Sequence, residues 1–264
     1  MRRIASIAVA AAVLLSLPGA VAVADTLLGT EAPDQILGTP NPDQIYGEAG
    51  SDRITGEASN DYLEAGSGDD DAAGGDGVDL VIGGTGNDRI DGGAGADVVY
   101  AGAGEDLVLG GLGADTLFGQ AGDDQLFGGA SGDRIYASIG SDYVEAGSGD
   151  DRVSSDEGDV AISAGSGADI VMTSGGIADV HGGSGGDRIR TGDAADRVSG
   201  GGGRDSIATG AGDDLVRARD RRRDRIDCGP GAGDTVEADR SDIVVGCESV
   251  LGPARRLAPR RRVR

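Results

Sequence analysis

The hydrophobic positions of this chain recur every nine residues, an interval that fits neither a helix nor a simple alternating strand. From residue 29 to residue 217 the sequence divides into 21 consecutive nonapeptides without insertion or deletion. The eighth position is Ile, Leu or Val in every unit except at Ala72, and the sixth is aspartate in 19 of the 21. Because nine residues are too few for a pair of helices, the pattern predicts a turn of about six residues followed by a strand of about three.

The five units from Gly74 to Phe118 show the motif most clearly: GGDGVDLVI, GGTGNDRID, GGAGADVVY, AGAGEDLVL and GGLGADTLF. They match the pattern GGxGxDxUx, in which U is aliphatic. On these residues the chain resembles the RTX (repeats-in-toxin) family of calcium-binding proteins, and the resemblance covers nearly all of the sequence after residue 24. It implies an all-β fold, a right-handed parallel β-roll (β-solenoid) in which two nonapeptides form one coil. Position eight would then face the interior, and positions seven and nine the solvent.

The resemblance also implies a ligand set for calcium: position-six aspartates of two turns on the same edge, together with backbone carbonyls at the glycine-rich positions. The candidate aspartates are Asp34, Asp43, Asp52, Asp61, Asp70, Asp79, Asp88, Asp97, Asp106, Asp115, Asp124, Asp133, Asp142, Asp151, Asp169, Asp187, Asp196, Asp205 and Asp214. The candidate glycines, where tight turns need positive φ or close backbone approach, are Gly75, Gly77, Gly84, Gly86, Gly93, Gly95, Gly102, Gly104, Gly111 and Gly113.

Charge indicates why such a stack needs a cation. Residues 25–217 contain 38 acidic and 9 basic residues, all of the latter arginine. Same-edge aspartates about 4.8 Å apart would repel each other by roughly 3 kcal/mol at an effective dielectric near 20. One aliphatic side chain per nine residues is too thin a core to offset this repulsion and the entropy lost on ordering. Calcium suits an irregular cage of oxygen ligands better than magnesium does. The alternative is that the aspartates only form Asx-turns in solvated loops.

The two edges are expected to differ. Counted from Gly29, even-numbered units carry aspartate at position six without a gap, from Asp43 to Asp205. Both units that lack this aspartate, at Val160 and Ala178, are odd-numbered and neighbours on the same edge. We therefore expect one continuous metal row and one row interrupted between about residues 142 and 196. Asp179, one place late, could partly replace the aspartate missing at position 178.

The sequence near the two termini predicts export of the chain and a disulfide bond. Residues 1–24 have the basic start, apolar run and Ala22-Val23-Ala24 ending of a signal peptide cleaved after Ala24; a membrane anchor is the alternative. After the array, residues 218–250 are expected to form cap coils bounded by a disulfide between Cys228 and Cys247, the only cysteines. Asp239 and Asp242 could add a metal site there, although solvated cap aspartates are the preferred interpretation. Residues 251–264, with six arginines and no acidic residue, are expected to be a disordered tail.

An outward column is predicted at position nine of the even units, comprising Tyr46, Glu64, Ile82, Tyr100, Phe118 and Tyr136. It would either stiffen one sheet by ladder pairing or contact a partner or a second copy. The Arg-rich tail is a second candidate contact, to an anionic cell surface.

The composition limits the function. So acidic a body repels nucleic acid and anionic lipid, and it favours cations as partners. The single histidine, His181, has no nucleophile beside it in sequence, and no GxSxG, HExxH or phosphate-loop motif is present. The sequence therefore predicts a secreted, extracellular, non-catalytic calcium-binding β-roll without a membrane span, in a structural or adhesive role. The alternative is a calcium-dependent accessory or scaffold module of an extracellular hydrolase or polysaccharide-modifying system.

Overall fold

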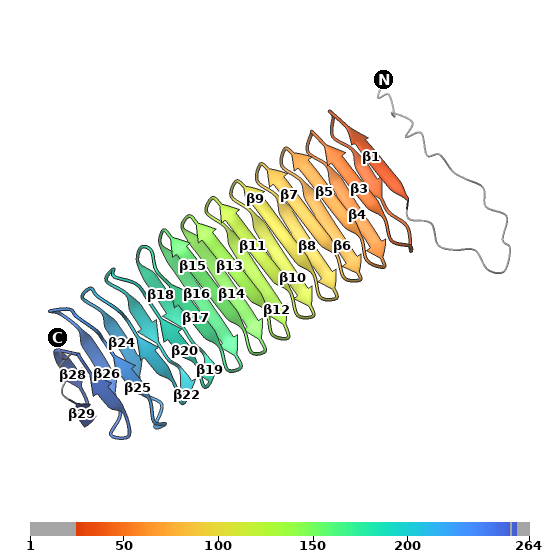
Figure 1. Ribbon diagram of the computed structural model, residues 1–264. Coiled ribbons are helices and arrows are strands. Elements are labelled where there is room, and N and C mark those ends of the chain that lie inside the picture. Colours follow the sequence, from red (N-terminus) through yellow and green to blue (C-terminus); the bar gives the residue numbers. More distant parts are fainter. Residues whose placement is uncertain (1–24, 254, 258–264) are drawn as a thin grey trace, which may run out of the picture.

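The computed structural model describes residues 25–253 and 255–257, and in this part of the chain every regular element is a β-strand. Figure 1 shows the strands stacked side by side along one axis, so that the first and last described strands lie at opposite ends of an elongated roll. The strands form two parallel sheets, and successive strands along the chain alternate between them with few exceptions. The predicted all-β parallel roll is therefore confirmed.

The first sheet contains 14 strands. In spatial order they are β1 (Thr26–Thr30), β3 (Gln44–Glu48), β5 (Tyr62–Ser67), β7 (Leu80–Thr85), β9 (Val98–Ala103), β11 (Thr116–Ala121), β13 (Arg134–Ile139), β15 (Arg152–Glu157), β17 (Ile170–Thr173), β20 (Arg188–Arg190), β23 (Ser206–Ala208), β25 (Arg225–Asp227), β27 (Ile243–Val245) and β29 (Arg255–Leu257).

The second sheet contains 15 strands. Its main path is β2 (Gln35–Leu37), β4 (Arg53–Ala58), β6 (Asp71–Asp76), β8 (Arg89–Ala94), β10 (Leu107–Leu112), β12 (Gln125–Ala130), β14 (Asp142–Ser148), β16 (Val160–Ser166), β18 (Ala178–His181), β21 (Arg197–Ser199), β24 (Leu215–Ala218), β26 (Thr235–Ala238) and β28 (Ser249–Leu251). Two short strands continue beside β16, namely β19 (Ser184–Gly185) and β22 (Gly202–Gly203).

The pairing register steps by two nonapeptides. Val108 of β10 lies opposite Ile90 of β8 on one side and Leu126 of β12 on the other. Units of the same parity therefore share a sheet, which confirms that two nonapeptides form one coil. We call the turns of the even-numbered units, which lead into the first sheet, the even edge, and the turns of the odd-numbered units the odd edge.

The strands of the central coils are longer than the sequence predicted. Strands β7 to β12 each span six residues, because they include positions one to three of the following unit. Position-two glycines take part in the ladder, as in the pair Gly111 and Gly129. The expected turn of six is thus a turn of about three, at positions four to six, and the expectation of three-residue strands holds only for short elements such as β20 and β23.

The interior is a single layer of aliphatic side chains between the two sheets. Every position-eight residue is buried, from Ile36 at the N-terminal end to Val216, and Ala72 is buried like the rest. Position one adds a second buried column that the sequence analysis did not single out, for example Ala65 and Ala101, each 0% exposed. The core is thin but continuous along the roll.

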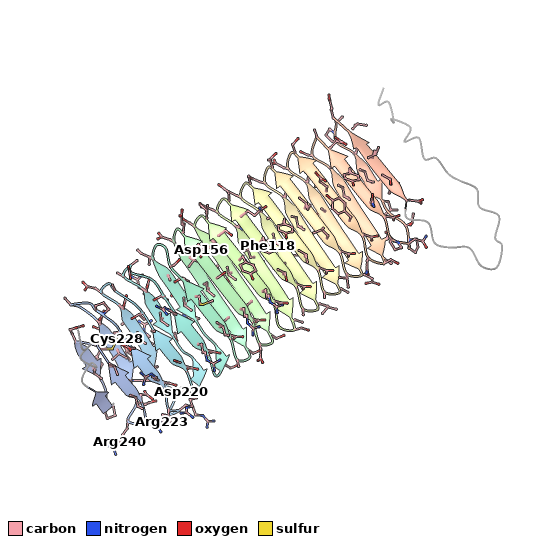
Figure 2. The ribbon with its side chains drawn as sticks, in the orientation of Figure 1. Phe118, Asp156, Asp220, Arg223, Cys228 and Arg240 are labelled. Atoms are coloured by element: carbon pink, nitrogen blue, oxygen red, sulfur yellow. A yellow bond between two sulfur atoms is a disulfide. The ribbon has the colours of Figure 1, made fainter. Side chains whose placement is uncertain are left out.

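The aromatic column lies on the outer face of the first sheet, and Figure 2 shows the Phe118 ring on that broad face. Phe118 stacks on Tyr100 with ring centroids 4.6 Å apart and on Tyr136 with centroids 4.7 Å apart. Tyr46 stands apart from this stack and contacts Tyr62 instead, at 5.5 Å. The stack is therefore a ladder of three rings.

The two sheets continue through the region expected to be a cap. Strands β25 to β28 extend both sheets beyond the array, after one-residue insertions between Asp214 and Asp224 and between Asp224 and Asp234. The predicted disulfide between Cys228 and Cys247 is present and joins residues flanking β25 and β27, which are neighbours in the first sheet. The disulfide therefore links two consecutive coils covalently.

The two ends of the chain fall partly outside the description. Strand β29 pairs with β27, so residues 255–257, expected in a disordered tail, have strand backbone. Residues 258–264 and the predicted signal peptide, 1–24, lie outside the described residues. The described residues also include no helix long and apolar enough to cross a membrane.

Candidate metal-binding turns

The predicted aspartates form two rows, one along each edge of the roll. Each stands at the end of a turn, directly before a strand, as Asp115 precedes β11 and Asp106 precedes β10. All of the predicted aspartates except Asp34 are buried, and Asp115 and Asp133 are 0% exposed. The rows are buried although they lie at the edges, because the turns of adjacent coils stack closely over them.

One carboxylate oxygen of each aspartate is held by the preceding coil. The backbone N–H of Asp97 donates to Oδ1 of Asp115 at 2.8 Å, and the N–H of Asp79 donates to Oδ1 of Asp97 in the same way. Because each bond spans one coil, the hydrogen bonds run parallel to the roll axis. These hydrogen bonds hold the carboxylates in position without a cation.

The other oxygen has no hydrogen-bond donor among the described residues. Buried Oδ2 atoms without a partner belong to Asp52, Asp61, Asp70, Asp79, Asp88, Asp97, Asp106, Asp115, Asp124, Asp133, Asp142, Asp151, Asp169, Asp187, Asp196, Asp205, Asp214, Asp224 and Asp234. Buried polar atoms are normally satisfied, so a periodic series of orphaned carboxylate oxygens calls for a ligand. A hard cation is the partner that a buried carboxylate oxygen without a donor fits.

Glycines close to the aspartates leave space around these Oδ2 atoms. A Cβ added at Gly74 would lie 2.5 Å from Oδ2 of Asp79, and one added at Gly92 would lie 3.0 Å from Oδ2 of Asp97. All ten glycines predicted as site residues have positive φ, for example 116° at Gly84 and 125° at Gly86. A Cβ at Gly84 would also collide with the carbonyl oxygen of Gly66 in the neighbouring coil. At Gly84 glycine therefore serves both the backbone and the spacing of the turn, although Glu48, Glu57, Gln120 and Ser138 adopt positive φ at position two of other units.

Burial makes the charged state of these carboxyls unfavourable. It raises the pKa of Asp88, Asp124 and Asp133 to about 7 from an ordinary value of 3.8, although the backbone hydrogen bond opposes the shift. Burial likewise raises the pKa of Asp97 and Asp115 to about 6. Neighbouring carboxylates of the same row add to the increase. A cation between two such groups would favour their ionised form and so reverse the shift.

The first two units differ from the others. At Asp34, Oδ2 accepts from the N–H of Thr30 at 2.7 Å and from its hydroxyl at 2.8 Å. At Asp43, Oδ2 accepts from the N–H of Thr39 at 2.6 Å. Threonine stands here at position two, where most later units have glycine, and its backbone N–H closes the carboxylate within the turn. In these two units the carboxylate is satisfied locally, but the bond comes from a residue four places earlier and Asp43 is buried, so neither is the solvated Asx-turn weighed in the sequence analysis.

The two rows also differ as the sequence predicted. On the even edge, the ladder of N–H to Oδ1 bonds runs without a gap from Asp43 through Asp205 to Asp224 and Asp242. On the odd edge it stops at Asp142, whose N–H donates to the Asp159 carbonyl instead, and it resumes where the N–H of Ala178 donates to Asp196. Val160 and Ala178 account for this gap, because neither has a carboxylate.

Asp179 does not fill the gap. Its side chain is half exposed on the outer face and lies 3.7 Å from the His181 imidazole. Position seven of a strand points outward whereas position six points into the turn, so a shift of one residue moves the carboxylate to the other face. The expectation of partial replacement is therefore wrong.

The even row extends further than the candidate list. Asp224 has an orphaned Oδ2, and burial raises its pKa to about 7. Asp242, expected to be a solvated cap residue, is 0% exposed and accepts from the N–H of Asp224 at 3.0 Å. Asp239 is half-buried and accepts from the N–H of Arg221. The sequence carried a signal for Asp224, in the aspartate–aliphatic spacing after each single insertion, whereas Asp242 stands before Val244 outside the nine-residue phase.

The cation site that fits these turns is mixed. No group of three or more His, Cys, Asp or Glu side chains converges on one point within the described residues. A cation held by two carboxylates from adjacent coils would need further oxygen ligands, and backbone carbonyls of the glycine-rich turns could supply them. That is the flexible all-oxygen environment that calcium accepts.

A parallel β-roll whose stacked turns present buried carboxylates defines a class of repeat protein that binds cations along its edges. The family model described as RTX calcium-binding nonapeptide repeat (4 copies) matches the chain at residues 37–72, 73–108, 109–144, 145–177 and 181–216. The chain therefore belongs to the family of RTX calcium-binding repeat proteins. Residues 178–180, between the last two matches, include Ala178, where the aspartate is missing. No curated protein matches the chain significantly.

Proposed function

We propose that this protein is a secreted, non-catalytic calcium-binding roll that folds outside the cell when its turns take up calcium, and that its role is structural or adhesive. The observation that carries the proposal is the unbroken even row, in which each orphaned Oδ2 from Asp61 to Asp224 lies one coil from the next. Aspartates of adjacent coils on this row, such as Asp97 and Asp115, would hold each ion together with backbone carbonyls.

Calcium binding is coupled to folding because the row of buried carboxylates destabilises the fold when no cation is bound. Without a cation, ionised carboxylates are stacked at one-coil spacing in a buried setting, which opposes the fold. With calcium bound, the neutralised row stabilises the stack, so that binding energy becomes folding energy. Extracellular calcium modules have dissociation constants of about 0.1–1 mM, so such sites would fill outside the cell and stay empty in the cytosol.

Three features support the secreted and non-catalytic parts of the proposal. The disulfide between Cys228 and Cys247 is typical of an oxidising compartment. Residues 1–24 have the pattern of a secretory signal. His181, the only histidine, lies on the outer face beside Asp179, with both side chains largely exposed, which is a poor setting for acid–base catalysis.

The test is a calcium titration of residues 25–264 followed by far-UV circular dichroism, with magnesium as the control ion. The proposal expects little strand signal in excess chelator and a cooperative gain of strand signal with calcium at sub-millimolar to millimolar concentration. A fully formed strand spectrum in chelator, unchanged by calcium, would contradict it.

A further inference from the structure

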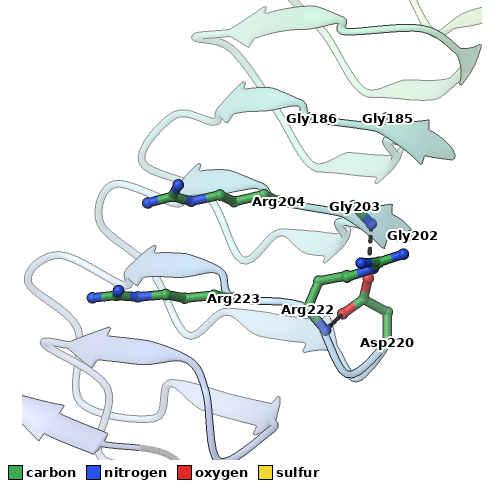
Figure 3. Close-up of a pocket in the computed structure, with 8 residues that line it drawn as sticks. All are labelled: Gly185, Gly186, Gly202, Gly203, Arg204, Asp220, Arg222 and Arg223. Carbon is green, nitrogen blue, oxygen red and sulfur yellow. Dashed lines mark hydrogen bonds between the residues drawn. The ribbon is translucent and has the colours of Figure 1, made fainter.

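A groove lies at the even edge near the C-terminal end of the roll. Its volume is about 760 Å³, and it spans successive coils (Figure 3). Three arginines, Arg204, Arg222 and Arg223, contribute side chains to its lining, together with Asp220. Figure 2 places Asp220, Arg223 and Arg240 at this end of the roll.

The groove is hollow because glycines line the rest of it. Gly185 and Gly186 contribute from one coil, and Gly202 and Gly203 from the next. A Cβ added at Gly202 would meet no heavy atom within 4 Å, whereas at Gly203 it would collide with the carbonyl oxygen of Gly185. Gly202 therefore borders open space that an ordinary side chain would fill, and its backbone does not have a φ that requires glycine.

A single inserted residue forms the loop that brings Arg222 and Arg223 to the groove. The step from Asp205 to Asp224 is 19 residues, one more than the usual coil. The extra residue makes a loop that Asp220 anchors, since its Oδ2 accepts from the N–H of Gly203 at 2.7 Å and its Oδ1 accepts from the N–H of Arg222 at 2.6 Å. Arg204 and Arg223 each precede an aspartate of the even row, and Figure 3 shows their side chains parallel, one coil apart.

The charge of the groove is opposite to that of the roll. None of its three guanidinium groups forms an ion pair with another described residue, and all three arginines are exposed. Residues 25–217 contain 38 acidic and 9 basic residues, whereas residues 219–223, which supply Arg222 and Arg223, contain four arginines and one aspartate, so the basic charge is local to this end of the roll. The carboxylate of Asp220 accepts from two backbone N–H groups and keeps its negative charge, but the three guanidiniums outnumber it, so the groove is basic on balance.

The lining excludes several kinds of anion. No aromatic side chain is present among the lining residues, so nucleic-acid bases would find only guanidinium planes on which to stack. No aliphatic side chain is present either, so the acyl part of a lipid has no apolar contact. The volume is of the order of that of sites for extended small ligands, and is generous for a single oxyanion. Paired guanidiniums bind carboxylate and other oxyanions bidentately.

We propose that this groove, lined by Arg204, Arg222 and Arg223 and opened by Gly202, is a binding site for an acidic oligosaccharide. The anionic group is a carboxylate or a sulfate on successive sugars, contacted by Arg204 and Arg223 from adjacent coils. The hydrophilic glycine floor accepts the sugar rings. The groove borders the even-edge turns of Asp187 and Asp205, whose glycine carbonyls are candidate calcium ligands, so the site belongs to the roll with calcium already bound.

The experiment is isothermal titration calorimetry on the mature chain in saturating calcium. Oligogalacturonate and a heparin-derived oligosaccharide of equal length are the carboxylate and sulfate probes, with a neutral glucan oligomer and oligoglutamate as comparison ligands. The expected result is binding of at least one acidic sugar, none of the neutral glucan, and weaker binding of oligoglutamate. The acidic sugar that binds more tightly identifies the anionic group.

Two variants and one control locate the site. Arg204→Gln combined with Arg223→Gln should weaken binding about tenfold or more, because two charge-assisted contacts are lost. Gly202→Gln should weaken it to a similar degree by filling the groove. Arg152→Gln, an exposed arginine on β15 far from the groove, should leave it unchanged.

Far-UV circular dichroism of each variant with and without calcium shows separately whether the roll has folded, so a failure of calcium-dependent folding is distinguished from a failure of this site. The proposal is overturned if folded protein binds neither acidic sugar, if oligoglutamate binds equally well, or if Arg152→Gln weakens binding as much as the groove variants.

Discussion

The backbone N–H of Asp115 donates a 2.8 Å hydrogen bond to Oδ1 of Asp133, one coil further along the even edge. Both residues are 0% exposed, and each keeps an Oδ2 without a donor among the described residues. The bond orients each carboxylate, while the free oxygens are the atoms that the proposed function assigns to a cation. The experiments below separate these two contributions.

Replacing Asp115 with asparagine keeps the shape of the side chain but removes its charge. We expect Asp115→Asn to raise the calcium concentration at the folding midpoint about tenfold, because one charged contact to the ion is worth roughly 1.5–3 kcal/mol. Asp179→Asn is the control, since Asp179 lies half exposed on the outer face. Calcium titrations by circular dichroism measure both midpoints, and equal shifts would contradict the assignment of the two edges.

The first units provide a second contrast within one row. Oδ2 of Asp43 already accepts from the N–H of Thr39, whereas Oδ2 of Asp61, one coil later, has no such donor. We therefore expect Asp61→Asn to shift the calcium midpoint clearly and Asp43→Asn to shift it by less than about threefold, which is under 1 kcal/mol. If Asp43→Asn has the larger effect, the local turn at Thr39 does not close that site.

Gly84, at position two of its unit, is expected to be important for stability. Gly84 has φ of 116°, and a Cβ there would meet the carbonyl oxygen of Gly66. Gly84→Ala should therefore lower the stability of the calcium-bound roll by about 1–3 kcal/mol or more, as a lower melting temperature. Gly202→Ala is the matched control, because its Cβ would meet no atom within 4 Å. A similar loss in both variants would mean that glycine content in general, rather than the position-two backbone, is required.

The pH dependence without metal should run opposite to that of most acidic proteins. Burial raises the pKa of Asp88 and Asp133 from 3.8 to about 7. Because the folded values exceed the unfolded ones, the contribution of these groups to stability is fully present below about pH 4 and is lost as the pH rises through about 7. In excess chelator, circular dichroism should show more strand at pH 5 than at pH 8.

Calcium should reverse that trend, because protons compete with the ion for the same oxygens. In saturating calcium the melting temperature should be higher at pH 8 than at pH 5. A roll that is more stable at pH 8 than at pH 5 in chelator would show that the row is not held in a buried, unneutralised state.

The disulfide is expected to stabilise the C-terminal coils only. It closes a loop with a sequence separation of 19 residues, for which the loss is about 3 kcal/mol. Cys228→Ser together with Cys247→Ser should speed amide hydrogen exchange in β25 to β28 while leaving β9 to β13 protected in calcium. Faster exchange along the whole roll would instead show that the coils unfold as one unit.

The nine-residue phase predicted most of the fold because each column has one physical role. Position eight must be aliphatic to fill a thin core, and position six must supply the carboxylate, so both columns could be read directly. Strand length could not be predicted in the same way. Glycines at positions one and two suggest a turn in the sequence, but in the structure they pair between neighbouring strands, as Gly111 does with Gly129.

Other details depended on contacts that the pattern does not contain. The closing of Asp34 by Thr30 depends on a threonine at position two, which the motif treats as a simple departure from glycine. The burial of Asp242 depends on the coils continuing past the insertions. The arginine groove depends on one inserted residue and a loop held by Asp220, neither of which has a repeating signal.

The register of two nonapeptides per coil, seen where Val108 pairs with Ile90 and Leu126, limits how such a chain can change length. Gain or loss of two adjacent units leaves every later residue on its own side of the molecule. Loss of a single unit would instead exchange the sides of all that follow, bringing Val160 and Ala178 into line with Asp133 and interrupting the row that is now complete. Among changes by whole repeats, gain or loss of complete coils is therefore the one that keeps both rows in place.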